Sequence, residues 1–156
     1  MRLASPTDFY NGCQYTAYRH HEGYAKRAAL FASYPDPILI VGCGFGFLVD
    51  ELLKLNKDAW GIDAEQWCID NRVTDRVLKA DILQPFSAHF SVAVTEDLLP
   101  CSDDDEALVV ARNCAAIAPI VIHLVTEHGQ AQELNYHSCV EWTRITQQLT
   151  VSLEGM

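Results

Sequence analysis

Long apolar runs are missing from this sequence of 156 residues. No stretch approaches the roughly 20 apolar residues that a membrane-spanning helix needs. The first residues, 1–6, also lack the apolar core of a secretory signal peptide. We therefore expect a cytoplasmic protein without a membrane anchor.

Cysteine pairs of the Cys-x-x-Cys type are absent as well, which argues against a zinc framework or a small disulfide scaffold. The set His123, His128, His137 and Cys139 matches no zinc spacing either, so we expect no metal site. We interpret the cysteines as reduced thiols, mostly buried. They are Cys13, Cys43, Cys68, Cys101, Cys114 and Cys139.

Basic residues are few: 11 Lys and Arg stand against 21 Asp and Glu, a formal net charge of −10. Binding to nucleic acid takes most of its affinity from basic contacts to phosphates, so the charge argues against such a partner. Apolar residues make up 49% and charged residues 21%, as in ordinary globular proteins. The length suits one domain over 1–156, with residues 1–35 as an N-terminal helical cap. The oligomeric state is not indicated.

Strand and helix patterns alternate along the chain. Apolar, β-branched runs predict strands at 38–41, 59–63, 76–82, 90–95, 119–125 and 149–153. Helical spacing of apolar residues predicts helices within 8–33 and at 47–55, 64–72, 102–117 and 138–145. This alternation predicts an α/β fold, a mostly parallel sheet with helices on both faces. The last strand is a candidate antiparallel edge strand.

A glycine-rich loop, Gly42-Cys43-Gly44-Phe45-Gly46, joins the first predicted strand to a helix. Such a loop lets the backbone approach a ligand and directs N–H groups at negative charge. The dinucleotide fingerprint Gly-x-Gly-x-x-Gly would require glycine where Phe47 stands. The observed spacing favours a nucleoside–carboxylate ligand such as S-adenosylmethionine.

Two carboxylates follow the next predicted strands. Asp63 comes 21 residues after Gly42, where it could accept both ribose hydroxyls; the alternative is a helix N-cap before Ala64. Asp81 could bind the adenine amino group, with Ile82 against the ring. The alternative for Asp81 is an ordinary turn residue.

Four segments, 38–47, 60–65, 79–83 and 94–100, resemble successive motifs of class I S-adenosylmethionine-dependent methyltransferases. The resemblance covers about residues 36–128. The chain is particularly similar to short, phage-type members of the family. It implies a three-layer, Rossmann-like fold with S-adenosylmethionine across the ends of the first, second and fourth strands. The cofactor-binding residues that it implies are Gly42, Cys43, Gly44, Phe45, Gly46, Asp63, Ala64, Asp81, Ile82 and Glu96.

The sequence departs from the family pattern inside the first strand, where Ile40 replaces the usual acidic residue. The Asp/Asn-Pro-Pro-Tyr/Phe signature is also absent from 95–100, which argues against amino-methylation of DNA bases. The leading hypothesis is a methyltransferase of a small-molecule or protein acceptor. Ile40 supports the alternative, an inactive S-adenosylmethionine-binding regulatory or interaction module. A nicotinamide-dependent reductase is a third hypothesis, disfavoured by Phe47.

Methyl transfer needs alignment of the reactants and sometimes removal of a proton. Glu96 and Asp97, at the end of the fourth strand, could orient or deprotonate a nucleophile, or could belong to a solvated turn. His123, in an apolar strand, is either a third candidate base or a core histidine. The acidic run after Ser102 is better explained by a helix capped at Ser102 than by a metal loop.

Overall fold

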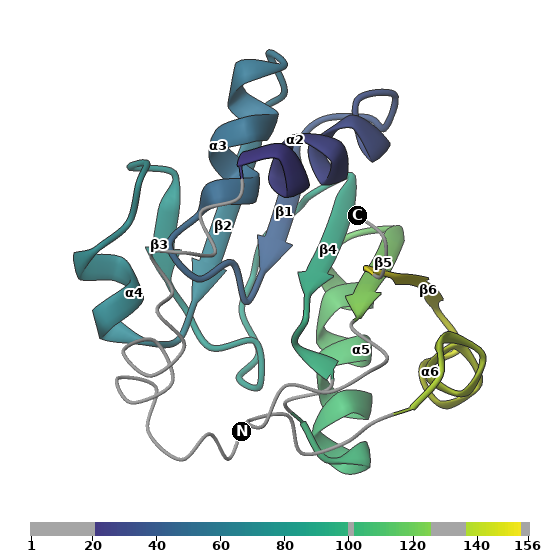
Figure 1. The fold of residues 1–156 in the computed structure, drawn as a ribbon. Helices are drawn as coiled ribbons and strands as arrows, with labels where there is room; N and C mark the ends of the chain where they lie inside the picture. The colour runs from purple at the N-terminus through teal and green to yellow at the C-terminus, as the bar shows by residue number, and fades with distance from the viewer. Residues whose placement is uncertain (1–20, 100–101, 126–136, 154–156) are drawn as a thin grey trace.

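The computed structural model describes residues 21–99, 102–125 and 137–153, and its elements are labelled in Figure 1. The first helix described is α2, His21–Leu30. Of the expected N-terminal cap, residues 1–20 lie outside the described part of the chain. In the three described ranges, no helix has the length and apolar character needed to cross a membrane.

Six strands form one sheet in the order β3-β2-β1-β4-β5-β6, and every neighbouring pair is parallel. The strands are β1 Ile38–Val41, β2 Ala59–Asp63, β3 Val77–Lys79, β4 Val92–Glu96, β5 Ile120–Val125 and β6 Leu149–Ser152. The expectation of an antiparallel edge strand is wrong, because β6 runs parallel to β5, with Leu124 opposite Val151. The intervening helix α6, Cys139–Thr146, allows the chain to return and enter β6 in the same direction.

Helices cover both faces of the sheet, which confirms the α/β, three-layer, Rossmann-like architecture (Figure 1). Successive side chains of a strand point to opposite faces. Ile38 and Ile40 pack with residues of α2 and α3 (Phe47–Lys54), whereas Leu39 and Val41 pack with residues of α5 (Asp104–Ile117). The short helix α4, Gln66–Asp70, contacts β2 and β3. All four side chains of β1 are buried, as expected for a central strand.

The acidic segment before α5 caps that helix, although not at the expected residue. Asp103 is the N-cap: its Oδ1 accepts from Glu106 N–H at 2.8 Å, and Glu106 Oε2 accepts from Asp103 N–H at 3.3 Å. Ser102 is buried instead, and its hydroxyl donates to Leu98 O at 3.0 Å. In the described part of the chain, no cluster of His, Cys, Asp and Glu side chains could hold a metal ion.

Candidate functional site

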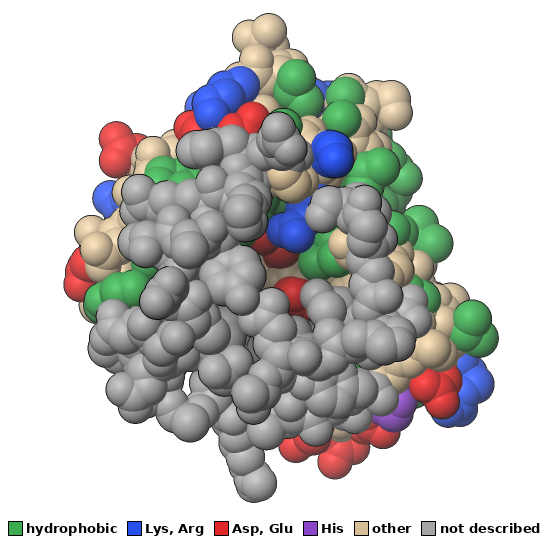
Figure 2. All heavy atoms as spheres, viewed as in Figure 1, with side chains coloured by type: hydrophobic (Ala, Val, Ile, Leu, Met, Phe, Trp, Pro, Cys, Tyr) green, Lys and Arg blue, Asp and Glu red, His purple; other side chains and the backbone are tan. Residues whose placement is uncertain are grey.

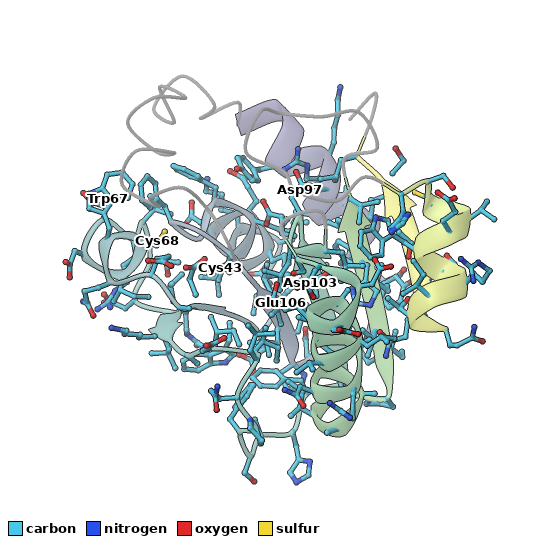
Figure 3. The ribbon with its side chains drawn as sticks, turned by 90° about the horizontal axis from the view of Figure 1, so that it is seen from below. Cys43, Trp67, Cys68, Asp97, Asp103 and Glu106 are labelled. Atoms are coloured by element: carbon cyan, nitrogen blue, oxygen red, sulfur yellow. The ribbon has the colours of Figure 1, made fainter. Side chains whose placement is uncertain are left out.

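The carboxyl ends of β1 and β4 lie side by side at the centre of the sheet. The chain leaves β1 toward β2 on one side, while β4 and β5 extend the sheet on the other. In open α/β sheets, ligands bind at such a switch point. Figure 3 views this edge and shows Cys43, in the glycine loop, between Cys68 and Asp97.

The glycine loop occupies this edge in a conformation that glycine adopts readily. Gly42, Gly44 and Gly46 have φ angles of 71°, 57° and 88°, in the left-handed region. A Cβ on Gly46 would overlap the side chain of Val77, and one on Gly42 would lie 3.3 Å from Leu98 Cδ1. The loop is therefore held between β3 and the segment that follows β4.

Asp63 ties the end of β2 to this loop. Its Oδ2 accepts from Gly44 N–H and its Oδ1 from Glu65 N–H, both at 2.9 Å. The side chain is nearly buried, and burial raises its pKa while the two backbone N–H groups oppose that rise. Asp63 does not cap α4, whose N-cap is Glu65. A carboxylate offers about four acceptor sites, and the two N–H groups and the Cys68 thiol use three of them, so these contacts leave acceptor capacity for a ribose hydroxyl.

Two side chains of the loop are buried in the protein interior. Phe45 packs on Trp67, with ring centroids 5.0 Å apart, and Cys43 lies against Gly61 in β2. Burial, together with the nearby acidic Asp63, raises the pKa of the Cys43 thiol. At these two positions we therefore expect any ligand contact to come from the backbone.

Three further residues expected at the cofactor follow the ends of β2 and β3. Ala64 is half-buried directly after Asp63. Ile82 is buried within the α5-side core. Asp81 Oδ1 accepts from Leu83 N–H at 2.9 Å, an arrangement that matches the turn alternative. Contacts of Asp81 and Ile82 with adenine, and of Ala64 with the cofactor, stay predictions.

Glu96 is paired with Arg27, a residue that the sequence analysis did not single out. Arg27 Nη1 lies 3.5 Å from Glu96 Oε1, with side-chain exposures of 19% and 11%. The Arg27 guanidinium also lies over the Tyr24 ring, 4.9 Å from its centroid. Burial raises the pKa of Glu96 to about 8, assisted by Asp97 and Asp63 and opposed by Arg27. At this pKa, the protonated form of Glu96 predominates at neutral pH. Figure 2 shows acidic and basic side chains together at the centre of the face toward the viewer.

Asp97 turns the chain away from β4 with a φ of 52°, which is unfavourable for a residue with a Cβ. Its N–H donates to Leu124 O at 2.9 Å, which anchors the turn to β5. The next residue, Leu98, contacts Gly42. The turn after β4 and the glycine loop thus form one packed unit around the switch point.

His123 is fully buried, and the structure does not bring it to the site. Its Nδ1 lies 2.7 Å from Thr95 Oγ1 and its Nε2 lies 2.6 Å from Gln148 Oε1. Because Gln148 Nε2 donates to Ala111 O at 2.8 Å, its Oε1 accepts from His123 Nε2, and Nδ1 accepts from the Thr95 hydroxyl. Burial lowers the pKa of His123 to about 4. Burial and these two hydrogen bonds favour the core alternative, and a role of His123 as a base stays a prediction.

A parallel sheet of this order, with a glycine-rich turn after β1 and acidic residues ending β2 and β4, defines a Rossmann-like fold. No family model matches the sequence, and no curated protein matches it. Solved structures do match, and the fold is that of S-adenosylmethionine-dependent methyltransferases.

One similar structure is a TehB-like SAM-dependent methyltransferase from Corynebacterium glutamicum, with a TM-score of 0.68 and 18% identity over 92% of this chain and 83% of that one. A SAM-dependent methyltransferase from Archaeoglobus fulgidus has a TM-score of 0.59 and 15% sequence identity, and the match covers 71% of this chain and 54% of that one. The glycopeptide N-methyltransferase MtfA, complexed with S-adenosylmethionine, has a TM-score of 0.52 and 14% sequence identity. The match covers 61% of this chain and 50% of that one. This chain thus matches about half the length of the latter two.

Proposed function

We propose that this chain is an S-adenosylmethionine-dependent methyltransferase acting on a small-molecule or protein acceptor, through one domain over 1–156. The observation that carries the proposal is the contact between Gly44 N–H and Asp63, beside the mostly buried Glu96 at the switch point. The methyltransferases of similar fold support it.

The residues present fit the cofactor. Asp63 keeps acceptor capacity for a ribose hydroxyl, and three glycines with positive φ shape the loop beside it. When bound, S-adenosylmethionine supplies a methyl group on a positively charged sulfur. The rest of the cofactor is a good leaving group, because its sulfur becomes a neutral thioether. Glu96, protonated at neutral pH, would orient an acceptor by hydrogen bonding and could take a proton from it only at higher pH. Asp97, at the same strand end, is the second candidate for orienting the acceptor.

A binding module without transferase activity is the second candidate function, and Ile40 favours it. The side chain of Ile40 is fully buried in the core under α2 and α3, so no carboxylate stands at this position of β1. Production of S-adenosylhomocysteine separates the two candidates, as described below.

Two further expectations rest on the sequence. The similarity to short, phage-type members is one of them. The other is a cytoplasmic location, which the free thiols of Cys43 and Cys114 support.

Calorimetric titration with S-adenosylmethionine, S-adenosylhomocysteine and NAD tests the binding step. We expect the first two ligands to bind and NAD not to bind. Gly44→Val should abolish binding, because Gly44 has a φ of 57° and its N–H meets Asp63. Asn56→Val is the matched control: Asn56 is exposed, has a φ of 58° and lies in the turn after α3. Binding of NAD alone, or unchanged affinity in Gly44→Val, would contradict the proposal.

Turnover tests the transfer step. The protein is incubated with methyl-labelled S-adenosylmethionine and a panel of small molecules and peptides, and S-adenosylhomocysteine is measured. Label on an acceptor supports the methyltransferase. Tight binding of the cofactor without turnover on any acceptor would support the binding module instead.

A further inference from the structure

The pair formed by Arg27 and Glu96 leaves two buried polar atoms without a hydrogen-bond partner. These atoms are Arg27 Nε and Glu96 Oε2; among the residues that the structure describes, neither finds a donor or acceptor. The pair itself uses other atoms, Nη1 of Arg27 and Oε1 of Glu96. An unpaired buried polar atom is destabilising, so two of them on paired residues at the end of β4 indicate a missing partner.

The chemistry of the two atoms indicates what that partner is. Nε–H lies on a different edge of the planar guanidinium from Nη1, and it can only donate. The Glu96 carboxyl is protonated at neutral pH, and its Oε1 faces the Arg27 cation, so its proton belongs on Oε2. Both orphan atoms are then donors. Two donors beside a positive charge match an oxyanion, and arginine binds carboxylates with particular strength.

We propose that Arg27 and Glu96 together bind a carboxylate of the methyl acceptor, so that the enzyme selects small acidic acceptors over their neutral counterparts. The inference rests on the proposed function and assigns Arg27 as a specificity-determining residue. Arg27 comes from α2 and Glu96 from the end of β4, so the pair joins the helical cap to the site.

The first experiment separates the acceptor from the cofactor, whose methionine part also carries a carboxylate. S-adenosylhomocysteine and 5′-methylthioadenosine, which lacks the amino-acid part, are titrated into the wild type, Arg27→Gln and Arg27→Lys. Arg112→Gln, exposed on α5, is the matched control. We expect the affinities for both nucleosides to stay within about twofold. A loss confined to S-adenosylhomocysteine in Arg27→Gln would assign the pair to the cofactor and overturn the proposal.

The second experiment measures acceptor binding with matched probes: salicylate against phenol, and anthranilate against aniline. Binding to the protein saturated with S-adenosylhomocysteine is followed by saturation-transfer NMR and titration. In the wild type and Arg112→Gln, at least one acid should bind about 10- to 100-fold more tightly than its neutral partner. Arg27→Gln should abolish this preference, and Arg27→Lys should keep part of it. Absence of acid binding, equal binding of the neutral probes, or an unchanged preference in Arg27→Gln would overturn the proposal.

The preference should also weaken above about pH 8, where Glu96 loses its proton. The charged groups that act on Glu96 are Arg27 from α2, Asp97 beside it and Asp63 from β2. A preference that is unchanged between pH 7 and pH 9.5 would contradict the role of Glu96. Failure of the proposed function appears separately, as a wild type that does not bind S-adenosylhomocysteine; the acid probes are then titrated without it. Circular dichroism confirms that each variant is folded.

Discussion

Replacing Glu96 by glutamine should remove a pH-dependent cost that the folded protein carries. Burial raises the pKa of Glu96 from 4.5 to about 8. Below pH 4.5 the side chain is protonated in both the folded and the unfolded chain, so it costs nothing. Between the two values only the folded state keeps the proton, and stability therefore falls as the pH rises. Above about pH 8 the full cost is present and constant.

Each pH unit between the two values costs about 1.4 kcal/mol. Glu96→Gln should therefore stabilise the protein by at most about 3 kcal/mol at pH 7 and about 5 kcal/mol at pH 9, with no gain below pH 4.5. Glutamine has the shape of the protonated side chain and offers Arg27 an amide oxygen in place of Oε1, so the packing should persist.

Urea unfolding of the wild type and Glu96→Gln at pH 4.5, 7 and 9 measures this difference, because other titrating groups cancel between the two proteins. Asp75→Asn is the matched control, since the Asp75 side chain is fully exposed and 3.9 Å from Arg72. Its stability profile should parallel the wild type. Parallel profiles for Glu96→Gln and the wild type would refute the assignment of Glu96 as a buried, protonated acid.

Three further substitutions test the loop, its anchor and the buried histidine. Asp63→Ala should weaken binding of S-adenosylhomocysteine by about 1.5–3 kcal/mol in calorimetry, because it removes a charged acceptor; an unchanged affinity would rule out that role. Gly46→Ala should lower stability in urea unfolding by about 1–3 kcal/mol, because its φ is 88° and its Cβ would overlap Val77; wild-type stability would contradict the packing described here. His123→Leu should cost about 2–4 kcal/mol of stability, since Thr95 and Gln148 lose their hydrogen-bond partner. Methyl transfer should persist below the melting temperature, and a selective loss of transfer would support His123 as a base.

The secondary structure followed closely from the sequence because its signals are local. A β-branched apolar run such as 38–41 forms a buried strand, and the observed β1 and β2 have the predicted bounds. The conformation of the loop at 42–46 could also be predicted, because three glycines in five residues indicate a backbone with positive φ. Errors of one residue arose where neighbours compete, as at the N-cap, where Asp103 rather than Ser102 accepts from Glu106.

The sequence by itself thus determined the α/β fold, the glycine loop and the acidic residues that end β2 and β4, since periodicity and spacing act over a few residues. Only the tertiary structure decided which distant groups meet. It brought Arg27 from α2 to Glu96, enclosed His123 between Thr95 and Gln148, and ran β6 parallel to β5. It also decided the charge of Glu96, because a pKa depends on burial and on charges that only folding brings together.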